Sequence, residues 1–226
     1  MYLNPTLEYK HISDWIATLI NKKISPRRLA HRLATHLNSR HPLRVKVQEN
    51  TDLLELGDFT IGAEYDCDLD YQNKKQFIII LIFNHPKHIP IEITGDFADR
   101  FTLELVEALV HEYQHQHQYR TRNFMLNKGY TSAHKDCKIK EDQEYLGSPD
   151  EVDAYAANIA ARFYLAKLLN TTVESLDLKH YYETFGPFHP IIRRLLKKIA
   201  TNTQYLMENE NAKKSKRTPR PRGRRV

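Results

Sequence analysis

Cysteine is scarce in this sequence, with only two residues in 226. Cys67 and Cys137 lie far apart, and neither belongs to a C-x-x-C pair. Disulfide-stabilised small domains and thiolate zinc sites both require closely spaced cysteines. The sequence therefore argues against a disulfide framework and against a Cys-based metal site, and we expect both thiols to be reduced.

Long apolar runs are also missing. No stretch reaches the roughly 18 consecutive apolar residues that a membrane-spanning helix needs. The first residues, MYLNPTLEYKHISDW, lack the unbroken apolar segment of a signal peptide. We therefore expect no transmembrane segment and a cytoplasmic location. The 41% of apolar side chains is nevertheless enough to fill a hydrophobic core.

Excess positive charge is confined to the C-terminal end. Residues 213–226 contain no acid and eight cations, namely Lys213, Lys214, Lys216, Arg217, Arg220, Arg222, Arg224 and Arg225. Without these eight, 26 of the 34 Lys and Arg remain against 28 Asp and Glu. We therefore expect residues 211–226 to be a disordered basic tail. Such a tail can bind nucleic acid through its charges.

The rest of the chain alternates helical and strand-like patterns. Apolar spacing predicts two amphipathic helices within residues 1–40, the second beginning at Ser25 and Pro26. PLRVKVQ and GDFTIGAEYD are typical of strands, and QFIIILIFN is typical of a strand buried on both faces. Further helices are expected at 99–120, from Ser148 onward, and from about 190 to 207. The predicted fold class is therefore α+β, with an N-terminal helical segment packed on a domain at 41–210.

One sequence motif indicates a chemical function. Residues 111–115, HEYQH, place His111 and His115 four residues apart within the predicted helix 99–120. This spacing puts the two imidazoles on one helix face, where both can reach one ion. Glu112 lies about 100° round the helix, where it can accept a proton from a water bound to that ion. The pattern indicates a catalytic zinc site of the H-E-x-x-H type.

The motif and its surroundings resemble the zincin metallopeptidases, and most closely their gluzincin branch. The resemblance covers roughly residues 43–170, where a small sheet precedes the VHEYQH helix and a second helix carries PDEVDAYAANIA. It implies a small zincin-like domain that holds one Zn²⁺ per chain and hydrolyses a protein or peptide substrate. It also implies that Glu151 is the third zinc ligand. The longer metzincin motif is absent, because Gln118 and Thr121 occupy its Gly and His positions.

The third ligand is open to other interpretations. Glu151 and Ser148 have the spacing of a capping box, in which the carboxylate bonds to the backbone of the helix start and needs no metal. Asp153 is a rival ligand, because periodicity alone does not choose between the two acids. Asp153 is otherwise a candidate for orienting a liganding histidine from outside the first shell.

Two further residues are candidate transition-state donors, His134 in a polar loop and Tyr155 after Glu151. His117, two residues past His115, is expected to face away from the ion. The function that follows is a zinc-dependent endopeptidase in which Glu112 is the general base. An extended substrate would pair with a sheet edge near residues 59–84. The alternative is a nucleic-acid-associated protein that binds through its basic tail and carries a structural or inactive zinc site.

Overall fold

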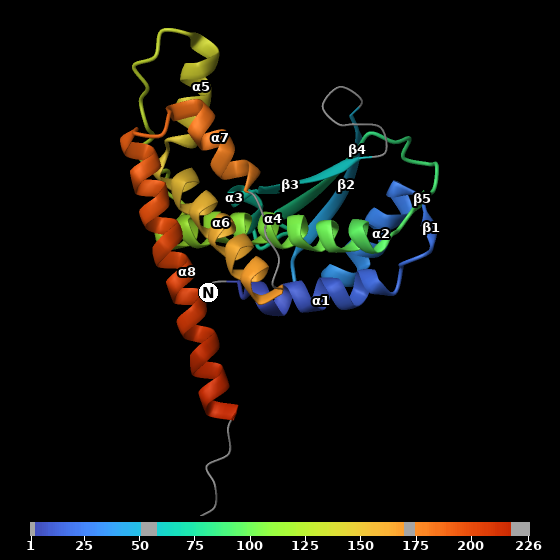
Figure 1. Ribbon diagram of the computed structural model, residues 1–226. Helices are drawn as coiled ribbons and strands as arrows, with labels where there is room; N and C mark the ends of the chain where they lie inside the picture. The colour runs from blue at the N-terminus through green and yellow to red at the C-terminus, as the bar shows by residue number, and fades with distance from the viewer. Residues whose placement is uncertain (1–2, 51–57, 170–174, 218–226) are drawn as a thin grey trace, which may run out of the picture.

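The computed structural model describes residues 3–50, 58–169 and 175–217, with side chains to residue 212. Within these ranges the chain forms eight helices and two small sheets, so the α+β prediction is confirmed (Figure 1). None of the described helices combines the length and the hydropathy required to cross a bilayer. In chain order the elements are α1 (Pro5–Ala17), β1 (Lys23–Ile24), α2 (Pro26–Leu37), β2 (Leu43–Glu49), β3 (Phe59–Tyr65), α3 (Cys67–Tyr71), β4 (Phe77–Phe83), β5 (Ile91–Glu92), α4 (Gly95–Thr121), α5 (Cys137–Leu146), α6 (Pro149–Leu169), α7 (Leu176–Phe185) and α8 (Pro190–Arg217).

The larger sheet has the strand order β2, β4, β3. β4 is the central strand; it pairs in parallel with β2, where Val45 faces Ile79, and antiparallel with β3, where Ala63 faces Ile79. β1 and β5 form a separate two-stranded antiparallel ribbon. Among the described strands β3 therefore lies at an edge of the sheet.

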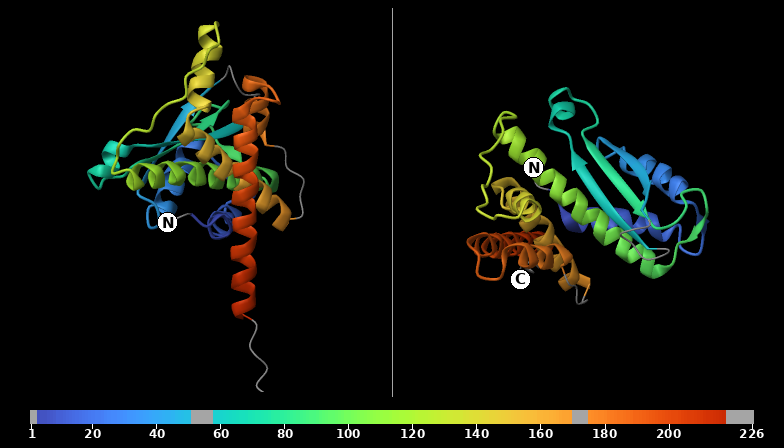
Figure 2. Two further views of the ribbon diagram at one scale, coloured as in Figure 1. Left: turned by 90° about the vertical axis from the view of Figure 1, so that its left-hand side faces the viewer. Right: turned by 90° about the horizontal axis from the view of Figure 1, so that it is seen from above.

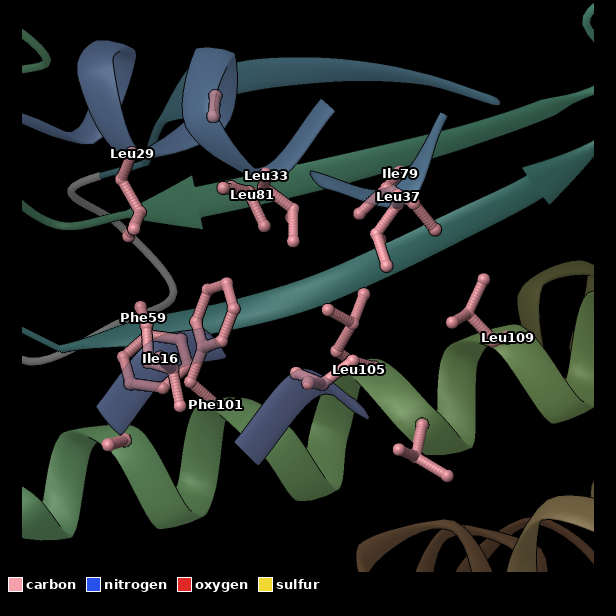
Figure 3. Close-up of a cluster of buried hydrophobic side chains, with 14 of the residues drawn as sticks. Ile16, Leu29, Leu33, Leu37, Phe59, Ile79, Leu81, Phe101, Leu105 and Leu109 are labelled. Carbon is pink, nitrogen blue, oxygen red and sulfur yellow. The ribbon is translucent and has the colours of Figure 1, made fainter. Parts of the chain in front are cut away.

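One face of the sheet supplies the main hydrophobic core. Alternate residues of β4, among them Ile79 and Leu81, are completely buried and pack with Phe59 of β3 and with Phe101 and Leu105 of α4 (Figure 3). The intervening isoleucines at 78, 80 and 82 are only partly buried. The prediction that this strand is buried on both faces is thus wrong for the face that carries the even-numbered residues. The packed helices fully bury only the face that carries the odd-numbered residues.

α4 is the longest helix on the sheet side and joins the two halves of the molecule. It begins at the N-cap Thr94, whose hydroxyl accepts from the Phe97 N–H at 3.1 Å. Figure 2 shows α4 between the sheet on one side and the pair α6 and α8 on the other. α6 and α8 form a second apolar cluster, in which Val152 and Ile159 meet Ile192 and Leu195.

Several helices differ from the sequence expectation. α8 continues beyond residue 207 to Arg217, so residues 213–217 belong to a helix and not to an irregular tail. Lys213, Lys214, Lys216 and Arg217 are in this last part of α8. The cations at 220, 222, 224 and 225 lie outside the described residues. α5 and α7 were not predicted; each has ten residues, of which only one is buried, Leu146 in α5 and Tyr181 in α7.

A buried carboxylate fixes the C-terminal half of α4. Asp70 of α3 accepts from Arg120 Nε at 2.8 Å and Nη2 at 2.6 Å, and from the Tyr65 hydroxyl at 2.6 Å. Burial alone would raise the pKa of Asp70, but the hydrogen bonds from Arg120 and Tyr65 outweigh it and lower that pKa. The folded state therefore favours the ionised form of Asp70.

We expect Asp70→Asn to lower the free energy of unfolding by about 1 to 2 kcal/mol at pH 7, because half-exposed Arg120 limits the gain from the pair. Since the folded-state pKa is depressed, this stability is present above the unfolded pKa. It should disappear as the pH falls from about 4 through the folded pKa. Urea unfolding of the variant and the wild type at a series of pH values measures this difference in the free energy of unfolding. Asp68→Asn, at an exposed position of the same helix, is the control; a loss that is equal in both variants would contradict the assignment.

Candidate metal centre

The two histidines of the HEYQH motif point to a common position. His111 and His115 lie one turn apart on α4, and their Nε2 atoms are 3.0 Å apart. Their side chains are only 11% and 12% exposed. The spacing of four residues thus has the geometric result predicted for it, with both imidazoles turned toward one position.

Glu151 joins them from the first turn of α6. Its Oε2 lies 3.4 Å from His111 Nε2, and its Oε1 lies 3.3 Å from His115 Nε2. Within the described residues, His111, His115 and Glu151 form the group of side chains that could hold a metal ion. Two residues from α4 and one from α6 therefore meet, although 36 positions separate His115 from Glu151 in the sequence.

The dimensions of this group fit a tetrahedral metal site. Bonds of 2.0–2.1 Å to nitrogen and oxygen at tetrahedral angles place neighbouring ligand atoms about 3.3 Å apart. The three measured separations of 3.0, 3.3 and 3.4 Å are close to this value. Glu151 Oε2 is also buried and has no hydrogen-bond partner among the described residues, as expected for a ligand atom. The residues thus fit a single ion with a fourth position left for water or substrate.

The charges of the group are mutually stabilising. Burial alone would raise the pKa of Glu151, but the two histidines outweigh it and lower that pKa to about 2. Burial likewise acts to lower the pKa of His115, and the nearby Glu151 carboxylate outweighs this and raises it. Glu151 is therefore an anion at neutral pH, which is the form that binds a metal.

The two alternatives for the acid are resolved by geometry. The Ser148 hydroxyl accepts from the Glu151 N–H at 3.3 Å, so Ser148 does cap the helix start. The Ser148 N–H is bonded to the Tyr145 carbonyl, however, and the Glu151 carboxylate lies at the histidines. Asp153 lies on the opposite side of α6, 2.5 Å from Lys198 Nζ of α8. Asp153 therefore faces α8 and lies outside the group of side chains that could hold a metal ion.

Glu112 lies beside the group but is not part of it. It is 6% exposed, and its carboxylate lies close to the Tyr65 backbone of β3. Burial raises the pKa of Glu112, and the neighbouring His111 and His115 partly oppose that effect. A carboxylate with a raised pKa is more basic than a solvated one and is better suited to accept a proton.

A cleft of about 670 Å³ opens in front of these residues. It is lined by His111 and Glu112 of α4, by residues of β3, α6 and α7, and by Tyr145 of α5. Tyr155 packs edge-on against the His111 ring at 4.6 Å between centroids. Burial raises the pKa of both Tyr155 and Tyr145, and the nearby Glu151 carboxylate adds to that effect. The cleft thus brings two tyrosine hydroxyls to the candidate ligands, one of which, Tyr155, was a predicted donor.

The other predicted donor is elsewhere. His134 lies before α5, its Nδ1 accepts from the Asp136 N–H at 3.1 Å, and it does not line the cleft. His117 lines a different cavity, together with Glu8 and His41. His134 is therefore not placed to contact a substrate at the candidate metal site in this structure.

Gln118 connects the two ligand helices, a role that was not predicted from the sequence. Gln118 is 9% exposed; its Oε1 accepts from His115 Nδ1 at 3.1 Å, and its Nε2 donates to the Asp150 carbonyl at 3.0 Å. Arg122 adds two bonds of 2.7 Å to the Asp150 carboxylate. Helical spacing could have indicated this contact, because residue 118 lies about one turn beyond His115 on the same helix face.

We expect Gln118→Leu to weaken metal binding by about 10 to 100 fold, because His115 loses the partner that fixes its ring and tautomer. Competition titration with a chromophoric chelator measures this affinity. The matched control is Gln114→Leu, one turn earlier on α4, whose side chain lines the cavity toward α8. Equal affinities in the two variants would show that Gln118 does not orient His115.

No family model, no curated protein and no solved structure matches the chain. The group of His111, His115 and Glu151, together with the cleft, is therefore interpreted from its own residues.

Proposed function

We propose that the chain is a zinc-dependent endopeptidase of the zincin type. The observation that carries this proposal is the convergence of His111, His115 and Glu151 beside a buried Glu112 at the base of a cleft. A purely structural site would need the three ligands but neither an oriented carboxylate nor an accessible cleft. The resemblance of HEYQH and EVDAY to the gluzincin pattern supports the same function.

The protein residues have distinct roles in this mechanism. His111, His115 and Glu151 would hold Zn²⁺, which when bound supplies Lewis-acid polarisation of the scissile carbonyl and a water of lowered pKa. Glu112 would serve as the general base that accepts a proton from the attacking water, and would pass that proton to the leaving amine. The hydroxyl of Tyr155 or Tyr145 donates a hydrogen bond to the oxygen on which negative charge develops.

The edge of β3 offers a backbone for an extended substrate. The N–H of Ile61 on this edge donates to the Glu104 carboxylate at 3.2 Å. Because backbone groups alternate in direction along a strand, the N–H and C=O of Ala63 face the same edge. Ala63 also lines the cleft. These groups support pairing of a peptide strand with β3, as expected from the sequence.

A cleavage assay tests the proposal. The zinc-loaded full chain should cleave an unstructured protein such as casein, a chelator should abolish the cleavage, and added zinc should restore it. Cleavage that is insensitive to chelation would contradict a metal-dependent mechanism. Absence of cleavage of any denatured protein by a chain that contains zinc would contradict peptidase activity.

A second candidate function rests on charge. The eight cations in residues 213–226, with no acid among them, support sequence-independent binding to the phosphates of DNA or RNA. This binding is compatible with peptidase activity, because it would bring the cleft to proteins on nucleic acid.

We expect the affinity of the full chain for DNA and RNA to fall by about 10³ or more between 50 and 200 mM salt, because most of the eight charges would displace counterions. Fluorescence anisotropy measures it. A chain that ends at Ala212 should lose the binding and keep its metal content. Undiminished affinity in that shortened chain would refute the assignment to the tail.

A further inference from the structure

A second group of polar side chains lines the same cleft beyond the metal ligands. Glu107 on α4 is four residues before His111, and Asn158 and Arg162 on α6 are seven and eleven residues after Glu151. These spacings put each residue on the same helix face as the neighbouring ligand. The cleft therefore continues from the metal site along both helices with a polar lining.

This polar group is buried but incompletely paired. Glu107 is 8% exposed and Asn158 is 6% exposed. Glu107 Oε2 accepts from Arg162 Nη1 at 2.7 Å, and Asn158 Nδ2 donates to Asp177 Oδ2 at 2.9 Å. Glu107 Oε1 and Asn158 Oδ1 have no hydrogen-bond partner among the described residues. Buried acceptors of this kind are normally satisfied, so the two atoms point to a donor that the chain does not supply.

The charge of the cleft favours a cationic donor. Its lining includes five carboxylates and two guanidinium groups, namely Asp58, Glu104, Glu107, Glu112, Asp177, Arg100 and Arg162. Both arginines are already engaged, Arg100 with Asp58 and Glu104, and Arg162 with Glu107. Burial raises the pKa of Glu107 to about 8; Arg162 opposes this and Asp177 adds to it. An arriving cation would therefore stabilise the ionised form of Glu107.

We propose that Glu107, Asn158 and Asp177 form a subsite for a cationic side chain, Lys or Arg, of the peptide substrate. The proposal rests on the proposed peptidase function and adds a substrate class to it. The ammonium or guanidinium group would donate to Glu107 Oε1 and Asn158 Oδ1, and its charge would be balanced by the surplus carboxylates. The subsite would thus favour peptides with a basic residue near the scissile bond.

Arg162 could instead favour an acidic side chain of the substrate, which is the alternative to the proposed preference for Lys or Arg. Its Nε is also buried without a partner among the described residues. An acidic side chain could accept from this atom. Such a ligand would have to enter beside Glu107 and Asp177, however, where like charges repel it.

A positional peptide library tests the subsite. At one position near the scissile bond, Lys or Arg should raise kcat/KM by about 10 to 100 fold over norleucine, the size typical of hydrogen bonds to charged groups. Norleucine has nearly the shape of Lys without its charge, so the comparison isolates the ammonium group. Equal rates for Lys and norleucine, or a preference for Glu, would overturn the proposal.

Glu107→Gln should reduce the preference for Lys over norleucine to near one, while cleavage of the norleucine peptide persists. The matched control is Glu64→Gln on β3, which makes the same change at an exposed position outside the cleft lining. An unchanged preference in Glu107→Gln would overturn the assignment. If this variant does not fold because Arg162 loses its partner, Asp177→Asn replaces it and should also lower the preference.

Binding measurements separate this proposal from the peptidase proposal. The zinc-loaded Glu112→Gln variant should bind the Lys peptide more tightly than the norleucine peptide by the same 10 to 100 fold, about the range set by a charged hydrogen bond. This result would support the subsite even if the wild type cleaves nothing. Equal binding of the two peptides, or no binding of either, would overturn it. Each peptide is compared with a free and an acetylated N-terminus; a preference that follows the free terminal amine would also overturn the side-chain assignment.

Discussion

Glu112→Gln is expected to lower the rate of peptide cleavage by about 10² to 10⁴ fold while the metal content stays unchanged. Gln has nearly the shape of Glu and can occupy the same buried position. It cannot accept a proton from water, so the general-base step is lost. Because Glu112 is not one of the three candidate ligands, its replacement should leave metal binding intact.

The measurement for Glu112→Gln pairs kcat/KM on one peptide with metal analysis of the same sample. Glu141→Gln, an exposed position on α5, is the control for the loss of one charge. Full activity in Glu112→Gln would remove Glu112 from the mechanism. Loss of the metal along with activity would instead show that Glu112 helps to hold the ion.

Replacing any of the three candidate metal ligands is expected to cause a large loss of metal affinity. His111→Ala, His115→Ala and Glu151→Ala should each weaken metal binding by more than the roughly 10 to 100 fold that follows loss of an outer-shell partner. Metal that binds only the folded chain stabilises it, by about 4 kcal/mol at a thousand times the dissociation constant. Zinc should therefore raise the unfolding temperature of the wild type but have little effect on these variants.

Asp153→Ala is the matched control for Glu151→Ala, because both remove an acid from the first turns of α6. Asp153 contacts Lys198 and Arg194 of α8, so its loss should leave the zinc-dependent rise in unfolding temperature unchanged. A larger loss of metal affinity in Asp153→Ala than in Glu151→Ala would show that the wrong acid has been assigned.

The sequence was most informative where a short-range pattern determines the geometry. The spacing of His111 and His115 placed both rings on one face of α4, and the structure confirms this arrangement. Ser25 and Pro26, as N-cap and first helical residue, correctly predicted the start of α2. In these cases the relevant partners lie within a few residues of one another, so helical periodicity is sufficient.

Contacts between distant segments could not be predicted in the same way. Periodicity left Glu151 and Asp153 as alternatives, because the choice depends on which face of α6 meets α4 and which meets α8. The pairing of Glu107 with Arg162 likewise depends on the relative register of α4 and α6. α5 was read as part of a polar loop, since Leu146 is its only fully buried residue.

The most direct test of this account is the metal content of the purified full chain, measured together with X-ray absorption at the zinc edge. We expect about one zinc per chain, with two imidazole nitrogens and one carboxylate oxygen at about 2.0 to 2.2 Å and a further light-atom ligand. His115→Ala should remove the ion. A chain that binds no zinc, or one whose zinc has no imidazole ligands, would contradict the assignment of His111, His115 and Glu151.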